Sequence, residues 1–260
     1  FTLGLMAAGA CLILVLLHGW KLTTSACVGA LLVLVPSGQM VASWSILWPY
    51  EMSAVLATAA YVLAETGFRL PGEAGTKRIL HAVAAVLVLL TGIWMFQPNG
   101  LFYLVFIAVT IAGWMKTSGP FPAKRILQHL ALLAGTMLLA YVLIRVAFAQ
   151  GWLPVSKRVA FEQDYAGKLL WYAENALPNA LALLVINDFM GRTAPWYALA
   201  VGTTTALLAV GCVLAFKRRG VRPGLVWLLT VVVLLGAAYG INMIASERWA
   251  SYRTIYPVVG

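Results

Sequence analysis

The residues best suited to chemistry lie in the second half of the chain, where acids and bases follow one another at short spacing. They are Glu162, Asp164, Lys168, Arg248 and Arg253. A carboxylate can take a proton from a hydroxyl as a general base, and a guanidinium binds phosphate through two hydrogen bonds. Such a set could act on a substrate that carries both a hydroxyl-rich unit and a phosphate. The alternative is that these residues are simply solvated in the connections between helices.

Other polar residues interrupt or flank apolar stretches. They belong with this set if those stretches and the set end at the same side of the folded chain. They are Ser37, Gly38, Gln39, Gln97, Asn99, Glu174, Asn175, Glu247 and Tyr252. Glu51 and Arg145 differ because they fall at or within apolar stretches, where an ionised group is costly and usually paired or functional. The competing interpretation for both is that the side chain extends to the membrane surface.

The histidines and cysteines do not form a metal-binding pattern. The histidines are isolated, each near an expected helix end, and the cysteines lie within apolar runs without a CxxC pair; the residues are His18, His81, His129, Cys11, Cys27 and Cys212. We therefore predict no metal site from the sequence. A glycine-rich phosphate loop, HExxH and GxSxG are also absent from the sequence, which disfavours nucleotide-driven chemistry and zinc proteolysis.

The composition indicates helices that span a membrane. Hydrophobic residues make up 62% of the 260 residues and charged residues only 10%, and the mean hydropathy is +0.90. An ordinary soluble domain carries about 25% charged residues. The net charge of +10 is not arranged as a stripe with interleaved aromatics, so it points to membrane topology rather than to nucleic acid.

Apolar stretches near the length of a membrane span predict an all-α integral membrane protein with about eight transmembrane or broken helices. The expected spans are 1–17, 22–36, 45–64, 79–96, 100–115, 126–149, 196–216 and 224–245. The second and fifth are short for a full crossing. Together they form one polytopic domain over 1–260, which we expect to be incomplete at both ends because the chain starts at Phe1 inside an apolar run.

The charges in alternate connections predict the orientation. One side carries Lys21, Arg69, Lys77, Arg78, Lys116, Lys124, Arg125, Lys217, Arg218, Arg219 and Arg222 against only Glu65 and Glu73. Lysine and arginine accumulate on the cytoplasmic side of membrane proteins, so we assign this side to the cytoplasm. On the opposite side acids and bases nearly balance. We therefore expect the polar set described above to lie on the outer face.

The longest connection, about 150–195, is expected to be a structured segment on the outer face. Its second half is apolar almost all round but contains Glu174, Asn175 and Asn179, with Pro178 as a break. This pattern predicts interfacial or broken helices rather than a clean span. Long structured connections of this kind are often functional.

Three short segments begin at Pro36 (PSGQMVASW), Met95 (MFQPNGLFY) and Ser246 (SERWASYRT). They resemble segments of the bacterial integral-membrane glucosyltransferases that modify O-antigen, within the GT-C superfamily. The resemblance implies that the cavity is formed by Ser37, Gln39, Trp44, Gln97, Pro98, Tyr252 and Arg253. It also implies a polyprenyl-phosphate-linked sugar donor, whose phosphate we expect Arg253 to contact. The family's acidic residue in the first outer loop has no counterpart here, and Phe96 stands where a Tyr is expected.

The resulting expectation is a glycosyltransferase that moves a hexose from a polyprenyl-phosphate carrier to a glycan or protein of the cell envelope. Asp164 and Glu162 are the candidate catalytic bases, and Asn99, Lys168 and Arg248 join the substrate-binding residues implied by the resemblance. We expect no nucleic-acid partner and a multi-pass location in the bacterial inner membrane, with the active face toward the periplasm. A cofactor is not predicted, and a divalent metal requirement stays open. The alternatives are a non-enzymatic subunit or scaffold of a larger complex and a transporter of a lipid-linked substrate.

Overall fold

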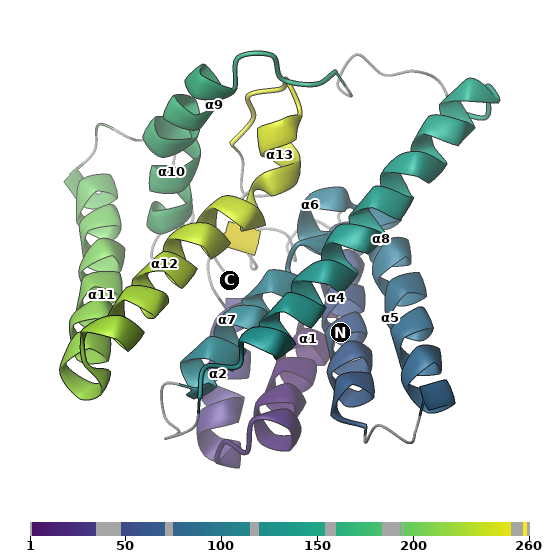
Figure 1. The fold of residues 1–260 in the computed structure, drawn as a ribbon. Helices are drawn as coiled ribbons and strands as arrows, with labels where there is room; N and C mark the ends of the chain where they lie inside the picture. Colours follow the sequence, from purple (N-terminus) through teal and green to yellow (C-terminus); the bar gives the residue numbers. More distant parts are fainter. Residues whose placement is uncertain are drawn as a thin grey trace.

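The computed structural model describes residues 2–34, 48–70, 75–114, 120–153, 160–183, 193, 195–250 and 257–258. Within these ranges every regular element is a helix (Figure 1). In chain order they are α1 Thr2–Leu12, η1 Ile13–Leu17, α2 Leu22–Leu34, α4 Trp48–Arg69, α5 Gly75–Met95, α6 Gln97–Gly100, α7 Tyr103–Trp114, α8 Ala123–Ala149, α9 Tyr165–Trp171, η4 Tyr172–Ala176, α10 Leu177–Ala182, α11 Pro195–Arg219, α12 Val221–Ala238 and α13 Gly240–Ile244. The elements η1 and η4 are turns of π-helix.

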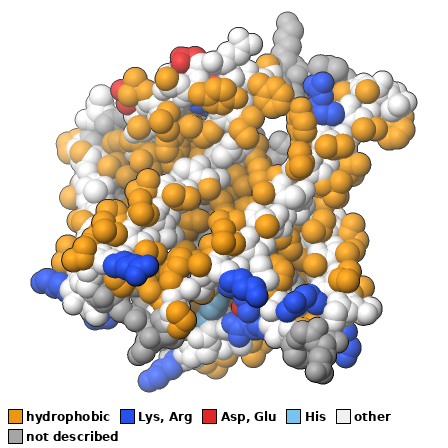
Figure 2. All heavy atoms as spheres, viewed as in Figure 1, with side chains coloured by type: hydrophobic (Ala, Val, Ile, Leu, Met, Phe, Trp, Pro, Cys, Tyr) orange, Lys and Arg blue, Asp and Glu red, His pale blue; other side chains and the backbone are white. Residues whose placement is uncertain are grey.

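Five helical stretches of the described chain are long and apolar enough to cross a membrane: α5, α6 with α7, α8, α11 and α12. Most of these helices turn apolar side chains outward, as Leu80, Leu127 and Leu229 do, each more than 60% exposed. Figure 2 shows hydrophobic side chains over the visible flank, with most Lys and Arg along the lower edge and acids near the upper edge. Apolar flanks between two polar ends are the properties of a helical membrane protein.

The helix α4 is the central element of the bundle and packs against α1, α5, α6, α7 and α8. Its alanines at 54, 57, 60 and 64 are completely buried, and such small side chains allow helix backbones to approach closely. One contact with α5 is made by Ser53, whose hydroxyl lies 2.8 Å from the carbonyl oxygen of Gly92 and 2.9 Å from that of Phe96. A polar hydroxyl therefore joins two helices at a point where only small residues fit.

The observed helices differ from the expected spans at several ends. The helix α4 continues to Arg69, although the expected span ended at 64. The stretch expected as 224–245 contains two helices, α12 and α13, with Tyr239 between them. The two N-terminal apolar helices, Met6–Leu17 and Leu22–Leu34, are shorter than a usual span. The all-α class is confirmed for the described residues, whereas a total of eight spans stays a prediction.

The connection expected to break at Pro178 instead contains a continuous helical run, α9–η4–α10. A proline has no amide hydrogen to donate to the preceding turn. Here the chain enters the wider π-turn η4 just before Pro178, so the run continues to Ala182. The irregularity therefore takes the form of a widened turn rather than an interruption.

Candidate functional site

Two segments about eighty residues apart meet at the upper end of the bundle, beside α9 and α13 (Figure 1). Phe161 and Ala245 form an isolated antiparallel bridge. The amide of Glu162 donates to the carbonyl of Ile244, and the amide of Ser246 donates to the carbonyl of Ala160, both at 2.9 Å. These bonds bring four sequence-predicted site residues together: Glu162, Asp164, Lys168 and Arg248. We call them the four-residue cluster.

Lys168, on α9, has a completely buried side chain that fixes the segment before Arg248. Its ammonium group donates to the carbonyl oxygens of Ala245 at 2.8 Å and Glu247 at 2.7 Å. It also lies 5.4 Å from the centre of the Trp171 ring. Burial lowers the pKa of Lys168 below its usual value, and the nearby carboxylate of Glu162 opposes that shift. Lys168 is thus a positioning residue rather than one that faces a substrate.

The two carboxylates of the cluster have different environments. The Glu162 carboxylate accepts hydrogen bonds from the amides of Asp164 and Gln163, both at 3.0 Å, and lies 3.8 Å from Nε of Arg248. The amide of Asp164 is the main cause that lowers the pKa of Glu162, assisted by the amide of Gln163, Arg248 and Lys168. A carboxylate stabilised in this way as an anion is a weak proton acceptor.

Asp164 is the more accessible of the two, with a side chain 67% exposed. One of its oxygens accepts from the amide of Gly167 at 2.9 Å and so caps α9. The other lies 3.5 Å from a terminal nitrogen of Arg248, whose side chain is 42% exposed. An exposed carboxylate beside an exposed guanidinium can bind a hydroxyl and a phosphate side by side.

The remaining predicted residues divide into those within the described ranges and those outside them. Gln97 is exposed at the start of α6, a helix that contacts α13 near the cluster. Asn99 is completely buried and donates to the carbonyl of Tyr50 at 2.9 Å, while its Oδ1 has no hydrogen-bond partner among the described residues. The residues outside the described ranges are Ser37, Gln39, Trp44, Tyr252 and Arg253.

The two ionisable residues expected within spans also differ. Glu51 is buried in the first turn of α4, with 7% of its surface exposed. A side chain extended to the membrane surface would be more exposed, so that interpretation is not supported for Glu51. Arg145 is exposed near the C-terminal end of α8, which agrees with an arginine that reaches the surface.

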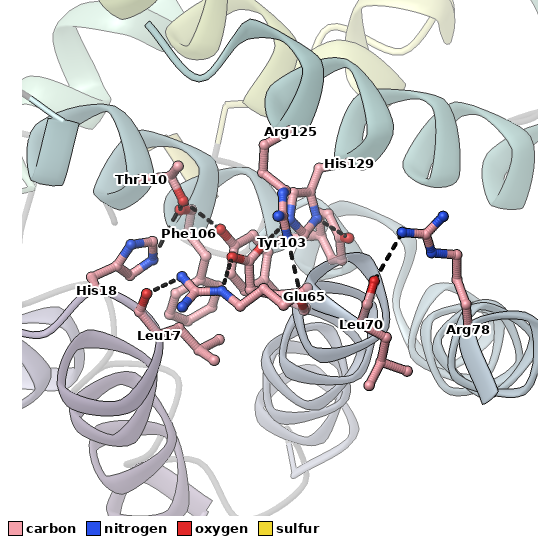
Figure 3. Close-up of polar contacts among 12 residues, drawn as sticks. Leu17, His18, Glu65, Leu70, Arg78, Tyr103, Phe106, Thr110, Arg125 and His129 are labelled. Atoms are coloured by element: carbon pink, nitrogen blue, oxygen red, sulfur yellow. Dashed lines mark hydrogen bonds and ion pairs between the residues drawn. The ribbon is translucent and has the colours of Figure 1, made fainter. Parts of the chain in front are cut away.

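A second polar group, which sequence reasoning missed, lies inside the bundle around Glu65 (Figure 3). The Glu65 carboxylate, only 3% exposed, lies 2.7 Å from Nε of Arg69, 3.3 Å from Arg125 and 2.8 Å from Nε2 of His129. Nδ1 of His129 lies 2.7 Å from the Tyr103 hydroxyl. We call these five residues the Glu65 network.

The network corrects the prediction that the histidines are isolated. His129 is 1% exposed and stacks on the Tyr61 ring with 4.3 Å between ring centres. His18 lies 3.4 Å from the Thr110 hydroxyl, and His81 bonds to the Lys77 carbonyl at 2.8 Å. A signal was present in the sequence, because Glu65 with Arg69 and Arg125 with His129 share the four-residue spacing of one helix face. Hydropathy does not show which helices are neighbours.

Among the described residues, no three His, Cys, Asp or Glu side chains lie close enough together to hold a metal ion.

Comparison with known proteins found no family model, curated protein or solved structure that matches the chain.

Proposed function

We propose that the chain is a membrane glycosyltransferase that moves a hexose from a polyprenyl-phosphate carrier to a cell-envelope acceptor. The observation that supports this most is the convergence of Glu162, Asp164, Lys168 and Arg248, which leaves Asp164 and Arg248 exposed and 3.5 Å apart. The cluster lies at the end of the bundle away from most of the Lys and Arg (Figure 2). From the positive-inside rule we propose that the cluster faces the periplasm in a bacterial inner membrane.

Arg248 is suited to bind the phosphate of the donor. A guanidinium stays charged at any physiological pH and offers paired donors to phosphate oxygens. In the reaction, the acceptor oxygen forms a bond to the anomeric carbon while the bond from that carbon to the phosphate oxygen breaks. The electron pair leaves with the polyprenyl phosphate, and Arg248 stabilises the negative charge that develops there.

Asp164 is the better candidate for the base that takes the acceptor's proton. Its exposed side chain can reach a hydroxyl, whereas the Glu162 carboxylate is held by two amides and lies near two cations. We assign Glu162 and Lys168 to positioning, since they tie the 160–164 segment to the 245–247 segment. Exposed aromatic rings next to the pair, Tyr165 and Trp249, offer apolar faces for a sugar ring.

The alternative functions have less support. A transporter needs a polar site near the middle of the membrane. The two polar groups described here lie instead toward opposite ends of the bundle, since α9 and α13 are at the upper end and the Glu65 network is near the start of α8 (Figures 1 and 3). A scaffold has no need for an exposed carboxylate beside an exposed guanidinium. The resemblance of the three short segments agrees with the enzyme.

The test uses membranes that contain the whole chain and a radiolabelled polyprenyl-phosphate-linked glucose. We expect label to move from the lipid to a water-soluble or envelope-bound product, and Asp164→Asn to reduce this transfer by about 100-fold or more, the usual contribution of general-base catalysis. Arg248→Lys keeps the charge but loses the paired donors, so we expect a loss of about ten-fold.

Glu174→Gln is the matched control, because Glu174 is an exposed acid in the same connection, and it should transfer sugar like the wild type. Equal transfer by the wild type and Asp164→Asn would exclude Asp164 as the base. Failure of the wild type to consume this donor, with two other hexoses also tested, would reject the proposed function.

A further inference from the structure

A pocket opens at the lower, basic end of the bundle, between the end of α4 and the beginnings of α5 and α8. Its volume is about 270 Å³, just below the range of about 300–1,000 Å³ of typical small-molecule sites. The lining residues used below are Phe68, Arg78, Phe121, Lys124, Arg125 and Gln128. This pocket is separate from the four-residue cluster and plays no part in the proposed reaction.

The pocket is positively charged. Three of its lining residues are cationic, Arg78, Lys124 and Arg125, and none is acidic. The nearest described carboxylate is that of Glu65, which pairs with Arg125 at 3.3 Å and is already shared with Arg69 and His129. In Figure 3, Arg78 reaches from α5 to the carbonyl of Leu70, at 3.1 Å. Arg78 and Lys124 therefore form no ion pair within the described chain and can receive an anion.

The beginning of α8 adds to this charge. The residue before the helix is Pro122, and it provides no side-chain hydrogen bond to the first turn. The first amides of a helix point away from its axis and carry a partial positive charge. Pro122 and the first-turn residues of α8, Ala123 to Arg125, line the pocket, so the positive end of this helix lies beside the cationic side chains.

The surroundings of the pocket are apolar. Ile79 and Leu80 of α5 and Leu127 of α8 are each about two-thirds exposed; the first two follow Arg78, and Leu127 lies two residues after Arg125. Two aromatic rings, Phe68 and Phe121, line the pocket itself. A polar, cationic pocket continuous with lipid-facing helix surfaces suits an amphiphile better than a free ion, because acyl chains can lie along the apolar residues while the phosphate enters the pocket.

We propose that this pocket binds the phosphate headgroup of an anionic phospholipid. Lys124 and Arg78 contact the phosphate, the positive end of α8 adds to the attraction, and Arg125 remains paired with Glu65. The inference is independent of the proposed glycosyl transfer, since it depends on residues at the other end of the bundle.

The experiment is a lipid titration of the purified, delipidated chain in detergent, followed by native mass spectrometry. The probes are phosphatidylglycerol, zwitterionic phosphatidylcholine with the same acyl chains, and inorganic phosphate as competitor. We expect phosphatidylglycerol to bind more tightly than phosphatidylcholine. In the double variant Arg78→Ala plus Lys124→Ala, each charge that is removed should weaken the binding of phosphatidylglycerol by about five-fold.

The matched control is Lys217→Ala plus Arg218→Ala, which removes two exposed charges from the end of α11 and should leave tight binding unchanged. Lys124→Glu tests the same site by charge reversal if the double variant is poorly expressed. Equal binding of the two lipids, or equal loss in the control, would refute the site. Displacement of the lipid by millimolar phosphate would show that the ligand is a soluble phosphate and overturn the lipid assignment.

Discussion

Among nearly isosteric substitutions, we expect Glu65→Gln to cause the largest loss of stability. The carboxylate is 3% exposed and has three cationic or potentially cationic neighbours within 3.3 Å. Gln preserves the size of the side chain and can keep one hydrogen bond, but it removes the negative charge. Arg69, Arg125 and His129 then remain close together without a counter-charge, which is the main cost of breaking a buried ion pair.

The magnitude follows from the exposure of each partner. The bond to His129, with both side chains buried, contributes about 1.5–3 kcal/mol. Arg69 is 43% exposed and Arg125 is 27% exposed, so each contributes at most about 1 kcal/mol and can turn toward water when the carboxylate is lost. We expect a total loss of about 2–4 kcal/mol, below the upper limit of about 5 kcal/mol for a fully buried pair.

Thermal unfolding in detergent, followed by tryptophan fluorescence, measures this loss. A decrease of about 5–15 °C in Tm corresponds to the expected free energy for a chain of this size. Glu174→Gln makes the same chemical change at an exposed position and should shift Tm very little. If the two variants had the same Tm, the Glu65 network would not stabilise the bundle, and the reasoning from its burial would be wrong.

Two further predictions concern acid sensitivity and helix packing. The amides and cations around Glu162 lower its pKa in the folded chain below the usual 4.5. The stabilisation by its carboxylate is therefore complete above pH 4.5 and is lost as the pH falls through the lowered pKa. Glu162→Gln should remove this part of the acid-induced decrease in Tm, and an identical acid dependence of Tm in the variant would contradict the assignment. At Gly29 an added Cβ would lie 2.5 Å from the carbonyl oxygen of Ala7, so Gly29→Ala should separate α1 from α2 and cost about 1–3 kcal/mol. Gly4→Ala, where nothing lies within 4 Å, is the control in the same thermal assay, and equal stability of the two variants would exclude close packing at Gly29.

The sequence was sufficient for the features that depend on composition along one segment. Apolar stretches predicted most of the long helices, because a membrane span is a local property of about 20 residues. Acids and bases at short spacing also marked Glu162, Asp164 and Lys168, and the structure places these residues beside Arg248. That contact depends on the chain returning to the same end of the bundle, which the alternation of spans already implied.

Features that depend on helix rotation and neighbours could not be predicted. Glu65 was counted as a loop residue because the apolar stretch ended at 64, yet α4 continues to Arg69 and turns Glu65 toward His129. The two residues are 64 positions apart, and hydropathy contains no information about which faces of α4 and α8 meet. The widened turn before Pro178 was equally hidden, since a proline predicts an irregularity but not its geometry.

The π-turn η4 determines the rotational register of everything that follows it in the same helical run. A π-turn accommodates an extra residue, and one residue corresponds to about 100° of rotation in an α-helix. Beyond η4, Asn179 accepts a hydrogen bond from the Tyr197 hydroxyl at 3.0 Å, and the carbonyl of Leu181 accepts one from Thr204 at 2.8 Å. Without the extra residue these acceptors would be turned by about 100° relative to α11. The π-turn thus rotates the second part of the helical run relative to the first, so that α9 contacts α13 and α10 contacts α11.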